Sequence, residues 1–241
     1  MIGTIALREL RSLFLSPLAW IILGVIQAIL GFSFFSSVTQ FLQHPDSRGV
    51  TAAVAVPVFG WAAVLLLFVS PLITMRLVSE ERRNQTLALL YSAPASMVEI
   101  VLGKYLGVMA YLLLVVAMLV LMPLSLLFGG TLDWGLLLTS ALGLILLLAS
   151  FAAIGLFMST LTQSPTLAAV ASFGALFLLW IFDASVNLWG ENFLSYLSII
   201  DHYLPFMQGL FNSEDTLYYL IFSAVFLIFS VRRLDADRLG A

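Results

Sequence analysis

Long apolar runs alternate with short polar segments along the whole chain. Six of these runs come close to the roughly 20 residues that an α-helix needs to cross about 30 Å of hydrocarbon. They lie at about 17–41, 52–78, 99–128, 134–160, 165–187 and 214–231. The pattern therefore predicts an all-α integral membrane protein with six transmembrane helices.

The first 16 residues show a different pattern, in which apolar and polar positions recur at near-helical spacing. The apolar positions are Ile2, Ile5, Leu10, Leu13 and Phe14, and the polar ones between them are Arg8, Glu9, Arg11 and Ser12. We expect residues 1–16 to form an amphipathic helix that lies along the membrane interface. The next apolar run continues without a small-residue cleavage site, which favours a retained span over a signal peptide.

Charged residues gather between the second and third apolar runs. They are Arg76, Glu80, Glu81, Arg82, Arg83, Glu99 and Lys104. A charge at the bilayer centre costs about 2.5 to 3.5 kcal/mol on insertion scales, so the block from Glu80 to Arg83 must lie outside the hydrocarbon. Residues 79–98 therefore form a solvent-facing hairpin between two spans.

Local signals inside this hairpin predict its elements. Arg76 and Glu80 stand four residues apart, a pairing that would continue the second helix out of the membrane. Residues 86–91 read as a short apolar helix that Pro94 ends. Ser96 and Glu99 then match a capping box, which begins the third span.

The segment before the last span is too polar to cross the membrane completely. We expect residues 188–213 to form an external re-entrant loop of two short helices, broken at Leu204–Pro205. Asp183 is the only acidic residue that lies inside a predicted span and not in its first turn. An intramembrane carboxylate is a functional candidate by default, so Asp183 is a candidate for a transport pathway, although an interfacial position near the external end fits equally well.

Composition and charge refine this picture. Of the 241 residues, 62% are hydrophobic and 10% are charged, whereas soluble domains have about 45–50% and 25%. Nine of the ten Lys and Arg residues lie near the two chain ends or around the hairpin, and only Arg48 lies in a loop on the other side. Because cytoplasmic loops carry the excess of Lys and Arg, both termini and the hairpin are expected to be cytoplasmic.

Signals for enzymatic chemistry are missing from the sequence. It has no phosphate-binding loop, zinc-protease motif, nucleophile elbow or dinucleotide fingerprint. The absence of cysteine excludes disulfides and Cys-ligated metals. His44 and His202 fall in separate external loops, where a structural or solvated role is expected. We therefore expect no catalytic residue, no cofactor and no metal site in this chain.

The hairpin resembles the signature of ABC-2 type permeases. The matching residues are Arg76, Glu80, Glu81, Arg82, Arg83, Thr86, Leu89, Leu90, Pro94 and the run Ile100–Lys104. Among these permeases the chain is most similar to the gliding-motility GldF-like branch, through His202, Phe206, Gly209, Asp215, Tyr218 and Tyr219. A Gly–Thr pair followed by Glu is usual in the hairpin, where this chain has Gln85–Thr86 and Ala88.

This resemblance implies a single ABC-2 type transmembrane domain over residues 1–241, with the type V (ABCG-like) fold. It implies a permease subunit of an ATP-driven exporter in the bacterial inner membrane, without its own ATPase domain. A separate ABC ATPase would bind ATP and Mg, and a second permease copy or a related permease would complete the pathway. The branch adds a large GldG-like envelope subunit. No nucleic acid is implied.

The ATPase is expected to dock on the hairpin. The candidate coupling residues are Glu80, Glu81, Arg82, Arg83, Thr86, Leu87, Leu89, Leu90, Tyr91, Pro94, Gly103 and Lys104. A helix with Leu87, Leu90 and Tyr91 on one face has no core of its own, so it either meets a partner or lies on the membrane surface. A non-transporting scaffold that passes ATPase motion to the cell envelope is the alternative function.

Overall fold

The computed structural model describes the chain except residues 45–48, 87–95, 129–130, 190–197 and 240–241, and at 128, 182–189 and 239 it describes the backbone alone. Every element in the described part is helical. The elements are α1 (Ile2–Leu15), α2 (Pro17–Gln43), η1 (Thr51–Ala55, a π-helix), α3 (Val56–Thr74), α4 (Ser79–Arg83), α6 (Met97–Leu124), η2 (Ser125–Phe128, a 3₁₀ helix), α7 (Trp134–Leu161), α8 (Pro165–Trp189), α9 (Leu204–Met207) and α10 (Ser213–Leu239).

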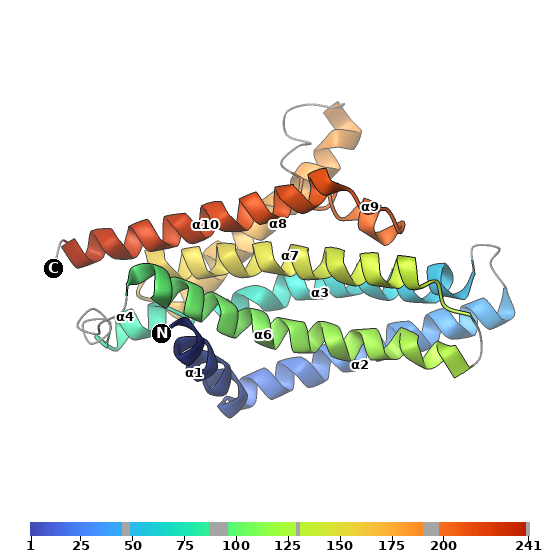
Figure 1. Ribbon diagram of the computed structural model, residues 1–241, viewed down its shortest axis with the longest axis horizontal. Coiled ribbons are helices and arrows are strands. Elements are labelled where there is room, and N and C mark those ends of the chain that lie inside the picture. Colours follow the sequence, from blue (N-terminus) through green and yellow to red (C-terminus); the bar gives the residue numbers. More distant parts are fainter. Residues whose placement is uncertain (45–48, 87–95, 129–130, 190–197, 240–241) are drawn as a thin grey trace.

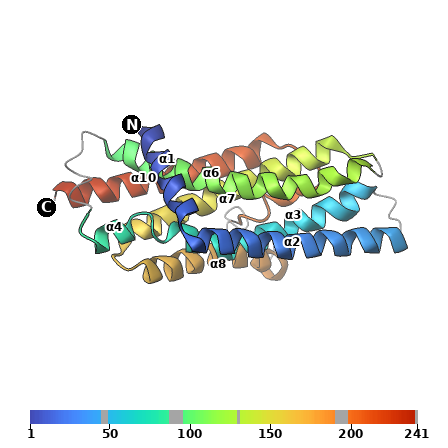
Figure 2. The same cartoon turned by 90° about the horizontal axis from the view of Figure 1, so that it is seen from below.

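The long helices form an elongated bundle around α7 (Figure 1). Helices α3, α6, α8 and α10 all pack against α7. Helix α1 lies across one end of the bundle at a steep angle to α2 (Figure 2). Both chain termini and α4 lie at this same end, which we call the terminal end, and the loop between η2 and α7 lies at the opposite end (Figure 1).

Each predicted apolar run corresponds to one long helix. Within the described residues, five helical stretches are long and apolar enough to cross a membrane: Pro17–Gln43, Thr51–Arg83, Met97–Leu127, Trp134–Leu161 and Ser213–Arg238. The remaining run coincides with α8, whose described apolar part, Pro165–Ile181, is shorter. The structure thus supports a multi-pass membrane protein, and a sixth crossing stays a prediction.

Helix starts follow the local signals in the sequence. Ser96 accepts a hydrogen bond from the Glu99 amide (3.2 Å), and the Ser96 amide donates to Glu99 Oε2 (3.0 Å), which confirms the predicted capping box. Asp133 caps α7 by accepting the Leu136 amide (3.1 Å). These caps satisfy amides that have no partner inside the helix.

Two local predictions are wrong. Helix α3 ends at Thr74, a turn separates it from α4, and no ion pair joins Arg76 to Glu80. The reason is Ser159 of α7, whose hydroxyl accepts the amides of Val78 and Ser79 (3.0 Å each) in place of helical carbonyls. The predicted helix break at Leu204–Pro205 is instead the first turn of α9. Amides in a first turn have no acceptor inside the helix, so the missing N–H of Pro205 costs no hydrogen bond.

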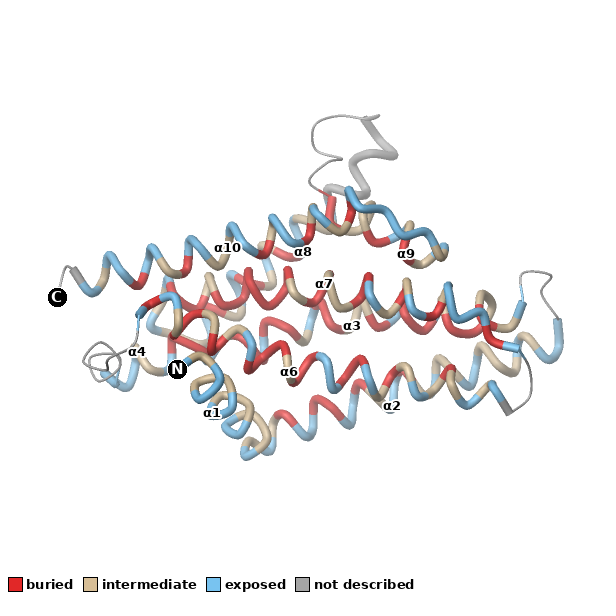
Figure 3. Tube along the Cα trace, viewed as in Figure 1, coloured by how far each residue is buried: buried red, intermediate tan, exposed pale blue. Residues whose placement is uncertain are grey.

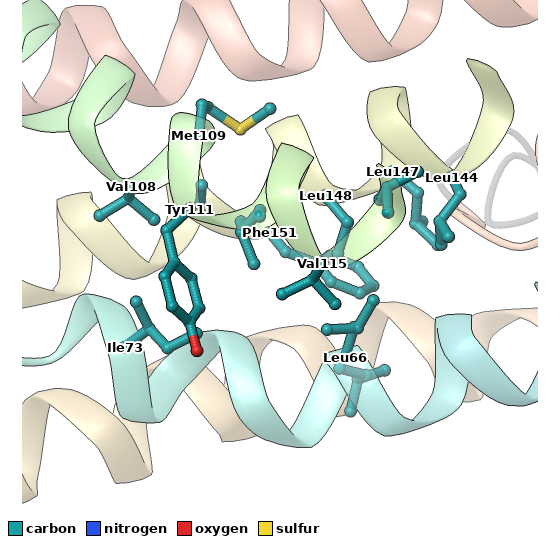
Figure 4. Close-up of a cluster of buried hydrophobic side chains, with 14 of the residues drawn as sticks. Leu66, Ile73, Val108, Met109, Tyr111, Val115, Leu144, Leu147, Leu148 and Phe151 are labelled. Carbon is teal, nitrogen blue, oxygen red and sulfur yellow. The ribbon is translucent and has the colours of Figure 1, made fainter. Parts of the chain in front are cut away.

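Close side-chain packing holds the centre of the bundle together. Leu144, Leu147, Leu148 and Phe151 of α7 lie against buried residues of α3 and α6, including Leu66 and Tyr111 (Figure 4). The outward faces of the long helices are exposed (Figure 3). They are apolar too, as at Phe32 and Phe35 of α2, which are 75% and 67% exposed. Because lipid is as apolar as these side chains, tight fit and hydrogen bonds hold the helices together more than hydrophobicity does.

Candidate functional site

Helix α1 packs directly on α6 through two glycines. A Cβ atom added at Gly103 would lie 2.7 Å from Ile5 Cβ, and one added at Gly107 would lie 2.7 Å from Glu9 Cβ and 2.9 Å from the Ala6 carbonyl oxygen. Residues one turn apart share a helix face, so the G-x-x-x-G spacing forms a flat surface for α1. The contact fixes α1 against a membrane span.

Lys104 joins three helices at this contact. Its ammonium group lies 2.9 Å from Glu9 Oε1 of α1 and 2.8 Å from Glu81 Oε1 of α4, and its side chain is only 2% exposed. A buried ammonium needs such partners, because an unpaired buried charge is strongly destabilising. We call Glu9, Glu81 and Lys104 the lysine triad. It links α4 to both α1 and α6.

A second ion pair ties α4 to the last helix. Arg82 donates to Asp237 of α10, and Asp237 also lies 3.6 Å from Arg233 on its own helix. The side chains of Arg82 and Asp237 are 15% and 22% exposed. Helix α4 is therefore bound to α1, α6 and α10 by charge, and Ser159 anchors the turn before it to α7. Such an element can move only if its neighbours move with it.

The end of α4 and the three residues after it are exposed. Arg83, Gln85 and Thr86 are exposed, and the Thr86 hydroxyl donates to the Glu81 carbonyl (3.2 Å). Gln85 has a φ of 56°, in the left-handed region that glycine adopts most readily. A glycine at this position would adopt the same conformation without strain.

Several predicted site residues lie outside the described part. Leu87, Leu89, Leu90, Tyr91 and Pro94 belong to the segment 87–95, so their proposed docking role stays a prediction. Asp183 lies in α8, where the backbone alone is described. Of the other candidates, Gly103 and Lys104 are buried between helices, while Glu80 and Arg83 are exposed.

The sequence did not identify three partners in this region. Glu9 binds Lys104, Ser159 binds the turn at residues 75–79, and Asp237 binds Arg82. Each of the three lies far along the chain from the group that it binds. One signal for Glu9 was present: it occupies the amphipathic helix, and a G-x-x-x-G surface requires some helix to cover it. Nothing comparable marked Ser159 or Asp237.

A separate polar cluster surrounds the start of α10, at the end of that helix away from α4. His202 Nδ1 lies 2.6 Å from Asp215 Oδ1, and the His202 ring stacks on Tyr218 with centroids 3.9 Å apart. Tyr219 donates to the Ile199 carbonyl (2.6 Å). The neighbouring Tyr203 donates to the Phe59 carbonyl (3.3 Å), and burial raises the pKa of its hydroxyl above the usual value. These bonds fix the 198–203 turns on α3 and α10.

Among the described residues, no group of three or more His, Cys, Asp or Glu side chains could hold a metal ion. Five charged groups at the terminal end are paired across helices: Glu9, Glu81, Arg82, Lys104 and Asp237. Their arrangement is suited to transmitting movement between helices.

Comparison with known proteins identifies the family of the chain. The family model described as "ABC-2 family transporter protein" matches residues 4–237, nearly the whole chain. A search of curated proteins found no match. Members of this family are membrane components without an ATPase domain of their own, and they normally act with an ABC ATPase. The chain therefore belongs to the ABC-2 transporter family and is a permease subunit of an ABC export system.

Proposed function

We propose that this permease is driven by a separate ABC ATPase that docks on the 79–98 hairpin from the cytoplasm. The ATPase binds ATP and Mg, and it moves the hairpin during its catalytic cycle. Two permease copies, or this chain and a related permease, then form the export pathway in the bacterial inner membrane. Six crossings and the type V fold, which the resemblance implies, complete this proposal.

The attachment of α4 is the observation that supports the proposal most directly. Glu81 is bonded to Lys104, and Arg82 is bonded to Asp237. A force on α4 therefore acts on α1, α6 and α10 together. Ion pairs with little exposure are screened less by salt than surface pairs. Helix α4 is therefore a rigid lever on the spans.

The segment after α4 supplies the docking surface in this proposal. Leu87, Leu90 and Tyr91 each contribute about 1.5 to 3 kcal/mol if fully buried against the ATPase, and the charges of Arg82 and Arg83 orient the approach. We retain the GldF-like assignment and the GldG-like envelope subunit as parts of the same proposal. They are supported by His202, Asp215 and Tyr218, branch-like residues that contact one another.

Breaking the ion pair between Arg82 and Asp237 tests the coupling. The permease is co-purified with its ABC ATPase, and ATP turnover of the complex is compared with that of the ATPase alone. Asp237→Asn should leave assembly intact but remove most of the change in turnover that the permease causes. Asp235→Asn removes an equal charge from an exposed position two residues away and should behave like the parent.

Two results would contradict the proposal. If Asp237→Asn couples as well as the parent, α4 does not transmit movement through α10. If the purified permease alone turns over ATP, no separate ATPase is needed. A complex that hydrolyses ATP in coupled fashion but moves no solute across vesicle membranes would favour the scaffold alternative.

A further inference from the structure

A cavity of about 350 Å³ lies beside the lysine triad. Helix α1, the first turns of α2, the end of α3 and α4 surround it. Ligand sites in proteins usually measure about 300 to 1,000 Å³, so the cavity can hold a small polar group. We call it the headgroup cavity.

The position of its walls places the cavity at the boundary of the hydrocarbon. Leu18 and Ile22 come from the first turns of α2, and Leu72 and Ile73 come from the last turns of α3. The polar lining comes from α1, from the turn after α3 and from α4. An occupant would therefore have an apolar part on the membrane side and a polar part facing α1 and α4.

Two cations in this cavity have no partner within the described part of the chain. Arg8 and Arg76 are exposed and make no ion pair or hydrogen bond there through their side chains. Guanidinium groups bind phosphate oxygens with well-matched geometry. Two of them at a membrane boundary favour a lipid phosphate, as basic pockets between spans commonly do.

An unpaired carboxylate lines the same cavity. Glu80 is exposed, and its side chain makes no ion pair or hydrogen bond with any described residue. The neighbouring Glu81 binds Lys104 through Oε1, and its Oε2 is buried away from the cavity. The hydroxyls of a glycerol headgroup can donate to Glu80 but carry no positive charge, whereas a primary ammonium group has three N–H donors and a charge that pairs with the carboxylate.

We propose that the headgroup cavity binds a zwitterionic aminophospholipid of the ethanolamine type. Its phosphate lies between Arg8 and Arg76, and its ammonium group donates to Glu80. The lining has three basic residues, Arg8, Arg76 and Lys104, and three acidic ones. A headgroup with one charge of each sign therefore fits better than an anionic one.

Lipid selectivity of the purified protein tests this assignment. The protein in mild detergent is equilibrated with equal amounts of phosphatidylethanolamine, phosphatidylcholine and phosphatidylglycerol, and the retained lipids are quantified by mass spectrometry. The parent should retain phosphatidylethanolamine about tenfold over each competitor, equivalent to about 1.4 kcal/mol. Arg8→Gln combined with Arg76→Gln should abolish retention, and Glu80→Gln should remove the preference over phosphatidylglycerol.

The control is Arg11→Gln, which removes an exposed charge from the same helix outside the cavity and should keep the parent's selectivity. Soluble glycerophosphoethanolamine has the same polar group without acyl chains, and it should not displace the lipid at equal concentration. Equal retention of all three lipids by the parent overturns the proposal. Three other results also overturn it. The first is a double variant that retains phosphatidylethanolamine as the parent does, and the second is an Arg11→Gln protein that loses this retention. The third is displacement of the lipid by soluble glycerophosphoethanolamine.

Discussion

Gln85 adopts a left-handed backbone conformation directly before Thr86, with a φ of 56°. For a residue with a Cβ atom this conformation is unfavourable by roughly 1 to 2 kcal/mol. The preceding Asn84 has a φ of −84°, which any residue adopts. Two exposed neighbours in one turn therefore differ in backbone strain and provide a matched pair.

Replacing Gln85 with glycine should stabilise the protein. Relief of the left-handed strain is partly offset by the greater freedom of glycine in the unfolded chain, so a net gain of about 0.5 to 1 kcal/mol is expected. The measurement is the apparent melting temperature in detergent. Asn84→Gly should give no gain, and a rise of equal size in both variants would show that strain at Gln85 is not the cause.

At the scale of elements, the contact between α1 and α6 leaves no room at its centre. A Cβ atom at Gly107 would meet the Ala6 carbonyl oxygen and Glu9 Cβ, and neither atom can rotate away. By contrast, a Cβ atom at Gly24 of α2 would meet nothing within 4 Å. The two glycines differ in their surroundings and not in helical position.

Gly107→Ala should therefore displace α1 and lower stability by about 1 to 3 kcal/mol, the usual cost of overpacking. Gly24→Ala should be neutral or stabilising, because alanine favours helix by about 1 kcal/mol over glycine. Thermal unfolding in detergent measures both, and protease cleavage within residues 1–16 reports the release of α1. Equal stability of the two variants would show that α1 is not held by this contact.

The elements themselves were largely predictable from the sequence. The six apolar runs and the cap at Ser96 depend on residues close together in the chain, and α6 begins where the cap signal stands. The site was predictable only in part. Lys104 was identified as a candidate, but Glu9 is 95 residues away from it. A charged side chain gives no local sign of which distant helix will neutralise it.

The whole molecule has an asymmetric arrangement of its ends. The two termini, α4 and the short turn between α7 and α8 lie together, and the loop before α7 lies at the opposite end (Figure 1). The sequence places nine of ten basic residues at the terminal end. The fold and the charge bias thus agree in dividing the chain between two sides of a membrane.

This division predicts which positions are accessible from outside the cell. The chain has no cysteine, so single cysteines can be introduced without background. Those at Thr131 and Ser213 should react with a membrane-impermeant thiol reagent in intact cells, and those at Gln85 and Gln163 should react only after lysis. All four positions are exposed in the structure. Labelling of Gln85 in intact cells would reverse the orientation.

The bond between Lys104 and Glu9 also has a consequence for the order of synthesis. Glu9 leaves the ribosome 95 residues before Lys104. At about 5 to 20 residues per second, α1 lacks its partner α6 for roughly 5 to 20 s. During this interval the membrane surface can shield the part of its apolar face that α6 later covers. The amphipathic pattern of residues 1–16 thus serves the nascent chain first, and the finished protein afterwards.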